Sequence, residues 1–165
     1  MDRLPSGRWS PCRGGFTLIE LVVVIALVGV MAALAVPRML ARGGIDAQTF
    51  PEEVLAAVRH AHRRAVASGC DVQFSLDASG YALATRGASC QSGAFSVAVP
   101  HPVRAGGFAA SLPAGVTVGS SVVVHFDRLG RPRATGGAVL TSAVTVVVGE
   151  RTLQIEPETG YARLL

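Results

Sequence analysis

The stretch GFTLIELVVVIALVGVMAALAV, Gly15 to Val36, decides the fold of this chain. From Phe16 to Val36 it runs for 21 residues, and only Glu20 carries a charge. As a helix, this run would be about 31 Å long, close to the thickness of the hydrocarbon core of a bilayer. The pattern therefore predicts a membrane-spanning helix over residues 16–36.

The orientation of this helix follows from the charges that precede it. Arg3, Arg8 and Arg13 lie before the apolar run, against one acid, Asp2. Basic residues flanking a span favour the cytoplasmic side of the membrane. We therefore expect the leader to lie in the cytoplasm and the remainder of the chain to be exported.

Glu20 needs an explanation, because a carboxylate within a membrane helix costs roughly 2.5–3.5 kcal/mol on insertion scales. A plain signal anchor gives no reason for it. A secretory signal would be cut after the apolar run, where Ala33-Leu34-Ala35 offers a small-residue site. Cleavage between Gly15 and Phe16 would instead create an amine one helical turn from Glu20. In a stack of helices, the amine of a neighbouring subunit could then pair with this carboxylate.

Gly15-Phe16-Thr17-Leu18-Ile19-Glu20 followed by an unbroken apolar helix resembles the prepilin signature of type IV pilins and type II secretion pseudopilins. The resemblance implies that prepilin peptidase removes residues 1–15 and that Phe16 is N-methylated. It implies that Glu20 and the Phe16 amine act in assembly with other pilins or pseudopilins in a helical fibre. It also implies a single-pass inner membrane protein with its C-terminal domain in the periplasm.

Beyond the span, the pattern predicts a second helix and then strands. Pro37 is expected to end or kink the first helix, and Gly43-Gly44 to break the chain. Thr49 with Glu52 fits a capping box, and Gly69 suits a C-terminal cap. From Cys70 onward apolar residues alternate, which predicts a hairpin around Asp77–Gly80 and further strands. These are expected at 95–99, 116–126, 138–148, 152–155 and 161–164.

The order of these elements, with HFDRLGRP and IEPETGYARL near the end, resembles the GspH/FimT family of minor pseudopilins. This resemblance implies an α+β, pilin-like fold in which a long N-terminal helix packs on an antiparallel sheet. We divide the chain into a leader, a membrane and assembly helix, an amphipathic continuation with a glycine-containing break, and a β-rich periplasmic domain: 1–15, 16–36, 37–69 and 70–165. The expected function is that of a minor pseudopilin in protein secretion.

Two other functions remain open. One is a FimT-like minor pilin of a type IV pilus that binds DNA in natural transformation. Arg128, Arg131 and Arg133 cluster around one turn and are the candidate phosphate contacts. The DNA-binding motif of that branch, Gly-Arg-x-Arg near the C-terminus, is incomplete here, because Gly160 is followed by Tyr161. The other alternative is a generic signal-anchored periplasmic protein.

The residues give no indication of catalysis, a cofactor or a metal. His60 and His62 are two positions apart on the predicted helix and point to different faces, whereas ligand pairs favour spacings of three or four. No nucleophile elbow, P-loop or paired-carboxylate spacing is present in the sequence. Of the net charge of +4, the residues before Gly14 supply +2, and the remaining twelve arginines against ten acids, about +2, are too mild to indicate a polyanion partner by themselves.

Cys70 and Cys90 are the two cysteines that follow the apolar run. If Leu76 pairs near Tyr81, the returning strand passes Cys70 at about Gly87, which brings Cys90 within reach. A structural disulfide and two separate thiols are both compatible with the sequence.

Overall fold

A computed structural model describes residues 17–40 and 42–165, with the side chains of residues 17–32 and 47–165. The chain divides into two compact units, up to Ala41 and from Arg42 onward, and each is described by itself. The leader and the cleavage position predicted at Gly15 and Phe16 lie outside the described residues.

The first unit contains α1, Leu18–Leu40. Thr17 caps its start, because the Thr17 hydroxyl accepts the backbone N–H of Glu20 at 3.3 Å and the Thr17 carbonyl accepts that of Leu21 at 3.2 Å. Thr17-x-x-Glu20 is thus a capping-box spacing that the sequence analysis missed. The helix continues past Pro37, so this proline does not end it.

The second unit begins with α2, Arg42–Ser68. The predicted break at Gly43-Gly44 and the predicted helix start at Thr49 both lie inside this helix. A glycine lowers helix stability by only about 1 kcal/mol, so other residues can keep the helix intact across Gly43 and Gly44. Gly69 ends the helix as predicted, with φ +68° and its N–H bonded to the Ala65 carbonyl at 2.9 Å.

A six-stranded antiparallel sheet follows, with the order β3-β2-β1-β5-β6 and β4 paired to β2. Its strands are β1 Val72–Asp77, β2 Gly80–Arg86, β3 Phe95–Ala98, β4 Ala109–Ser111, β5 Val122–Phe126 and β6 Pro132–Ala134. The predicted hairpin is present, with Leu76 opposite Tyr81. Two short strands, β4 and β6, were not predicted.

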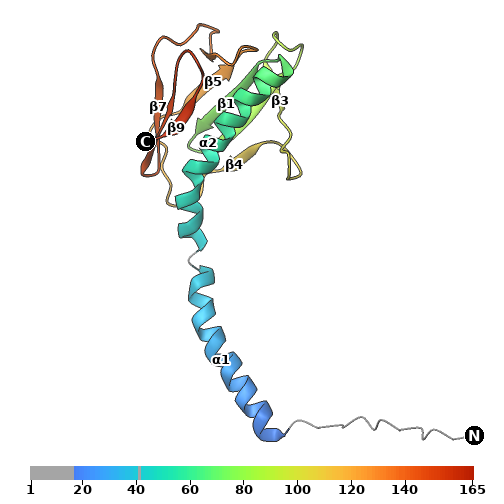
Figure 1. Cartoon of the computed structure of the whole chain (residues 1–165), viewed down its shortest axis with the longest axis vertical. Helices are drawn as coiled ribbons and strands as arrows, with labels where there is room; N and C mark the ends of the chain where they lie inside the picture. The colour runs from blue at the N-terminus through green and yellow to red at the C-terminus, as the bar shows by residue number, and fades with distance from the viewer. Residues whose placement is uncertain (1–16, 41) are drawn as a thin grey trace, which may run out of the picture. The chain divides into compact units, whose positions relative to one another are not determined.

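A three-stranded antiparallel sheet completes the unit, in the order β7-β8-β9. Its strands are β7 Val144–Val148, β8 Arg151–Ile155 and β9 Ala162–Leu164. Figure 1 shows α2 lying across the sheets of this unit, with β1 beside it. The described residues thus have the predicted α+β organisation, a helical N-terminal part followed by antiparallel sheets.

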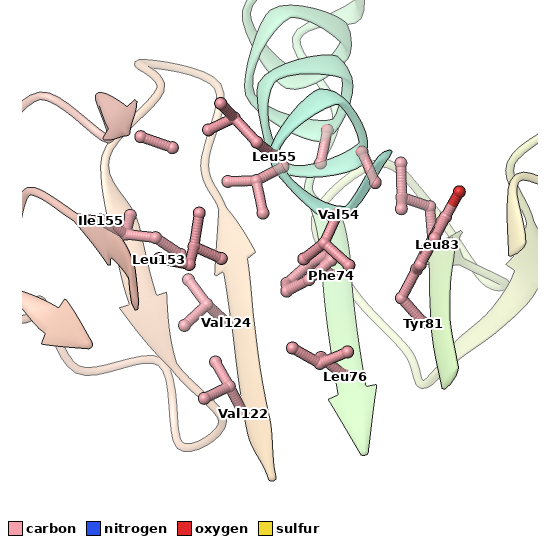
Figure 2. Packing of buried hydrophobic residues seen from close by; sticks show 14 of the residues in the cluster. Val54, Leu55, Phe74, Leu76, Tyr81, Leu83, Val122, Val124, Leu153 and Ile155 are labelled. Carbon is pink, nitrogen blue, oxygen red and sulfur yellow. The ribbon is translucent and has the colours of Figure 1, made fainter. Parts of the chain in front are cut away.

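One hydrophobic core joins α2 to both sheets (Figure 2). Val54 and Val58 of α2 are fully buried, together with Phe74 of β1 and Leu153 of β8. The inward residues of β1 alternate with more exposed ones, as expected for a sheet with one face on a core. Burial of this helix face explains why α2 tolerates Pro51 within its span, since tertiary packing outweighs local propensity.

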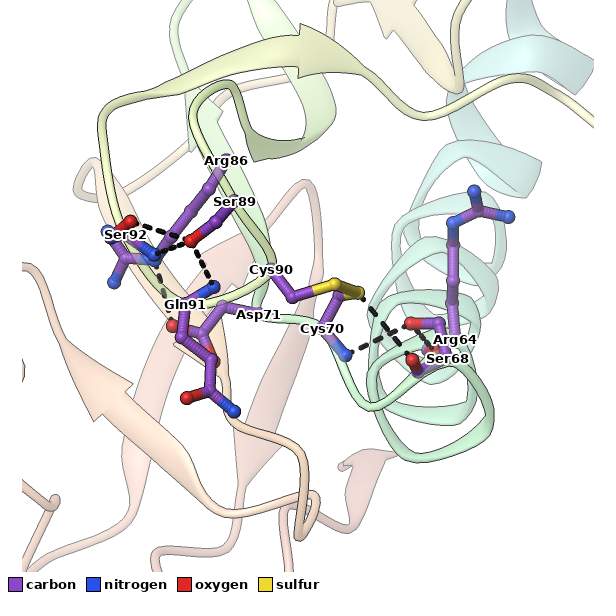
Figure 3. Close-up of a disulfide and its surroundings, with 9 residues drawn as sticks. All are labelled: Arg64, Ser68, Cys70, Asp71, Arg86, Ser89, Cys90, Gln91 and Ser92. Atoms are coloured by element: carbon purple, nitrogen blue, oxygen red, sulfur yellow. Dashed lines mark hydrogen bonds and ion pairs between the residues drawn. A yellow bond between two sulfur atoms is a disulfide. The ribbon is translucent and has the colours of Figure 1, made fainter.

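Cys70 and Cys90 form a disulfide that ties the end of α2 to the loop after β2 (Figure 3). The backbone N–H of Asp71 also donates to the Cys90 carbonyl at 2.8 Å. The bridge spans a sequence separation of 20 residues. It holds the loop of residues 87–93 beside the first residues of β1.

Removing this bridge is expected to destabilise the second unit. In the chain-entropy model, closing a loop of this length contributes about 3 kcal/mol to the free energy of unfolding. We expect the double variant Cys70→Ser/Cys90→Ser to lose about that much, measured by urea unfolding of the full chain in detergent. Dithiothreitol treatment of the unaltered protein is the matched control and should give the same loss. An unchanged urea midpoint in both would contradict the prediction.

Candidate functional site

The N-terminal motif places Glu20 in the first turn of α1. All the large apolar side chains from Leu18 to Met31 are exposed, from 45% for Val22 to 81% for Leu18. A carboxylate in the first turn interacts favourably with the helix dipole. The described part of α1 therefore presents an apolar surface with one acid near its N-terminal end.

Among the residues described, no helix combines the length and the hydropathy of a membrane span. Phe16 and the side chains of residues 33–36, which belong to the predicted span 16–36, lie outside the described part of the chain.

The two histidines of α2 lie against different aromatic rings. The ring of His60 stacks on Phe108 with 4.7 Å between centroids, and that of His62 meets Phe126 edge-on at 5.6 Å. Burial lowers the pKa of His60, and the neighbouring Arg63, Arg64 and His101 lower it further. Within residues 17–40 and 42–165, no group of three or more potential metal ligands gathers.

Two of the three candidate DNA-contacting arginines, Arg131 and Arg133, pair with the carboxylate of Asp127. Asp127 is 7% exposed and lies directly after β5. Its Oδ2 accepts from Nε of Arg131 at 3.1 Å and from Nε of Arg133 at 2.9 Å. Two of the three guanidinium groups therefore already have a carboxylate partner, whereas Arg128 is exposed.

The same carboxylate also holds the turn. Asp127 Oδ1 accepts the backbone N–H groups of Leu129 at 2.9 Å and Arg131 at 3.0 Å. Burial raises the pKa of Asp127, but the N–H of Arg131, the Arg133 guanidinium, the N–H of Leu129 and the Arg131 guanidinium outweigh it, so the pKa is lowered.

Replacing this carboxylate is expected to cost stability. Asp127→Asn leaves Arg131 and Arg133 without their anion, and we expect a loss of about 2 kcal/mol in the free energy of unfolding at pH 7. Because the folded-state pKa is lowered, the contribution is complete above the ordinary pKa of about 3.9 and disappears as the pH falls through the folded-state value. The difference from the unaltered protein should therefore shrink from pH 7 to pH 3.

Urea unfolding at both pH values measures this difference. Glu158→Gln removes one charge from an exposed acid and is the matched control, with an expected change within about 0.5 kcal/mol. Equal losses in the free energy of unfolding for the two variants would contradict the prediction, because they would show that the effect comes from the change in net charge.

Tertiary structure also brings together two stretches of similar sequence. Gly130 opens Gly130-Arg-Pro-Arg and Gly160 opens Gly160-Tyr-Ala-Arg, thirty residues apart. A Cβ built on Gly160 would overlap the carbonyl oxygen of Gly130, so the two turns are in direct contact. Arg163 of the second stretch is paired with Glu156 at 3.4 Å and bonded to Gln154 at 3.0 Å.

The N-terminal region of the chain is similar to that of known proteins. Residues 11–36 match the prokaryotic N-terminal methylation motif. The chain is 34% identical over 65 residues to the type II secretion system core protein G of Pseudomonas aeruginosa, 39% of each chain. It is 48% identical over 33 residues to the type IV major pilin protein PilA of Myxococcus xanthus, 20% of this chain and 15% of that protein.

Two further proteins are similar to the chain. The type IV narrow pilus major component PilA5 of Thermus thermophilus is 44% identical over 48 residues, 29% of this chain and 41% of that protein. The crystal structure of the type IV minor pilin FimU of P. aeruginosa has 18% sequence identity and a TM-score of 0.49, covering 72% of this chain and 91% of that one.

The chain spans less than half the length of each sequence relative that it matches. The matched motif contains the Gly15–Phe16 junction and Glu20, and it overlaps α1 over residues 18–36. In its N-terminal residues, the chain is therefore similar to type IV pilins and to a type II secretion core protein.

Proposed function

We propose that the chain is a minor pseudopilin, a structural subunit of a type II secretion pseudopilus that takes part in protein secretion. Prepilin peptidase would cut the precursor after Gly15, and Phe16 would become the methylated N-terminus. The match of residues 11–36 to the N-terminal methylation motif carries this proposal. The similarity to the type II secretion system core protein G supports a type II secretion pseudopilus as the assembly to which the chain belongs.

The exposed apolar surface of α1 supports a role in assembly. Contiguous exposed apolar patches of this kind mark a surface that lipid or another protein covers. We propose that residues 16–36 lie in the inner membrane before assembly and between neighbouring subunits afterwards. The partners would then be other pilins or pseudopilins, with the β-rich unit in the periplasm.

Glu20 has a specific part in this proposal. In an apolar environment, its carboxylate needs a partner of opposite charge. The Phe16 amine of a neighbouring subunit would supply it and would fix the axial register between the two helices. The chain would act through these contacts, as a subunit without chemistry of its own.

The second candidate is a minor pilin of a type IV pilus. The two pilin relatives, PilA and PilA5, favour it. This candidate includes DNA binding through Arg128, Arg131 and Arg133, of which only Arg128 has no carboxylate partner among the described residues. Deleting the gene separates the two candidates, because loss of protein secretion supports a pseudopilin and loss of surface pili or DNA uptake supports a pilin.

The intact mass and N-terminal sequence of the protein from its native membrane test the proposal directly. We expect a chain that starts at N-methylated Phe16. A start at Val36 would identify a secreted protein cut after Ala33-Leu34-Ala35. An intact N-terminus at Met1 would identify a signal-anchored protein, and either result would overturn the assembly role of Glu20.

A further inference from the structure

The strongest feature outside the N-terminal motif is a pocket of about 330 Å³, lined by residues from the large sheet and the loop that the disulfide holds. We call it the arginine pocket, after Arg86, Arg128, Arg131 and Arg133 in its wall. By the alternation of β5, its His125 lies on the face opposite Val124 and Phe126, which face the α2 core. The pocket is thus separate from the hydrophobic core.

The wall of the arginine pocket is positively charged. Four guanidinium groups face the two carboxylates of Asp71 and Asp127, which leaves a formal excess of two positive charges. Asp71 accepts from Nε of Arg86 at 2.8 Å (Figure 3). Arg128 is exposed and makes no hydrogen bond or ion pair with the described residues.

Donors remain available on the paired arginines as well. Each guanidinium has five N–H donors. Arg86 uses Nε and one terminal nitrogen, on Asp71 and on the Gly93 carbonyl at 2.7 Å. Arg133 does the same, on Asp127 and on the Gly137 carbonyl at 3.0 Å. These contacts fix the guanidinium planes while leaving N–H groups for a ligand.

His125 is an independent indication of a ligand. It is only 2% exposed, and its Nδ1 has no hydrogen-bond partner among the described residues. Its ring lies 5.3 Å from that of Phe95, between centroids. Buried polar atoms are usually satisfied, so an unpartnered nitrogen in a pocket wall is unusual. Burial lowers the pKa of His125, which favours the neutral imidazole, whose Nδ1 can serve as a donor or an acceptor depending on the tautomer.

The pocket wall is also held in place before any ligand binds. The Cys70–Cys90 disulfide joins the loop that carries Gln91 to the start of β1. Asp127 fixes the turn that carries Arg128 and Arg131. A preorganised site of this kind loses little conformational entropy when a ligand binds.

We propose that the arginine pocket binds a doubly charged tetrahedral oxyanion, the phosphate group of inorganic phosphate or of a phosphate monoester. Two negative charges neutralise the excess of the wall. Four tetrahedral oxygens accept from guanidinium groups that approach from β2 and from both sides of the turn between β5 and β6. A guanidinium group can bind phosphate in a bidentate manner, by donating two parallel N–H hydrogen bonds to phosphate oxygens. The excess positive charge of the pocket wall disfavours the binding of a cation.

Phosphate binding can be measured on the full chain in a mild non-ionic detergent by isothermal titration calorimetry at low ionic strength. We expect saturable binding of one inorganic phosphate per chain and much weaker binding of acetate, which carries one charge. Arg128→Gln should weaken phosphate binding at least about tenfold, since a charge-assisted hydrogen bond is lost. Its thermal midpoint should not change, because Arg128 is exposed and unpaired.

Arg104→Gln is the matched control, an exposed arginine outside the pocket. It should leave phosphate binding unchanged. Absence of saturable binding, an equal loss in both variants, or full binding by Arg128→Gln would each overturn the proposal. Binding of a short DNA duplex that depends on Arg128, without binding of phosphate, would also overturn it and would support the DNA contact instead.

A second readout reports on the pocket interior. In NMR titrations of the histidine-labelled full chain, phosphate should raise the pKa of His125, because a nearby dianion favours the imidazolium. In Arg128→Gln, the same phosphate concentration should raise it less. No response of His125 to saturating phosphate would show that the anion binds elsewhere.

Discussion

From the proposed role of Glu20 in assembly, we expect Glu20→Gln to reduce incorporation of the chain into the proposed fibre at least about 100-fold. Gln has the shape of Glu and can still serve at the third position of a capping box, so the helix start should persist. The change removes only the charge that would pair with the Phe16 amine of a neighbour. An uncompensated charge in an apolar environment costs roughly 2.5–3.5 kcal/mol, which corresponds to about two orders of magnitude in an equilibrium.

The measurement replaces the native gene and quantifies the subunit in the fibre fraction by immunoblotting. Thr17→Ala is the matched control, because it removes the hydroxyl that accepts the Glu20 N–H and leaves the carboxylate in place. We expect it to lose only about 1 kcal/mol of helix stability and to assemble. Normal assembly of Glu20→Gln would mean that Glu20 serves the helix start rather than the contact between subunits.

Gly160→Ala is expected to destabilise the second unit by about 4 kcal/mol. Gly160 has φ +68°, which is unfavourable for a residue with a Cβ. The new methyl group would overlap the Gly130 carbonyl oxygen and approach Cδ2 of His62 at 2.9 Å. The Gly130 oxygen belongs to the backbone, so it cannot move aside by a change of rotamer.

Gly69→Ala is the control that separates the strain of a positive φ from the crowding of the new methyl group. Gly69 has the same φ of +68°, but a Cβ there would meet nothing within 4 Å. This variant should therefore lose only about 1–2 kcal/mol. Urea unfolding of the full chain in detergent compares the two. Similar losses would show that the backbone conformation alone accounts for the effect, and that the contact between the two turns contributes little.

Local patterns predicted much of the second unit. The alternation from Val72 onward indicated β1 and β2, and the pairing of Leu76 near Tyr81, which was considered as a condition for the disulfide, is present in the sheet. The predicted start of α2 was wrong, because Thr49 with Glu52 has the spacing of a capping box. Both residues lie within α2, close to Phe50, which is buried in the core. Strands β4 and β6 were missed because their residues, Ala-Ala-Ser and Pro-Arg-Ala, show no alternation of large apolar side chains.

The N-terminal motif could be identified from the sequence by itself. The proposed cleavage position, the apolar run and the acid are contiguous along the chain, so all three can be identified from the order of the residues. The candidate partners of Glu20 also follow from this order, since the Phe16 amine lies one turn away.

The arginine pocket was decided only by the tertiary structure. Its members come from Asp71, Arg86, His125 and the turn after Asp127, which β-sheet pairing brings together. The sequence showed three clustered arginines but not that Asp127 pairs with two of them. It also gave no indication that Gly130 and Gly160 touch. Contacts between distant residues depend on strand order and register, and these depend on the packing of the whole unit rather than on any local pattern.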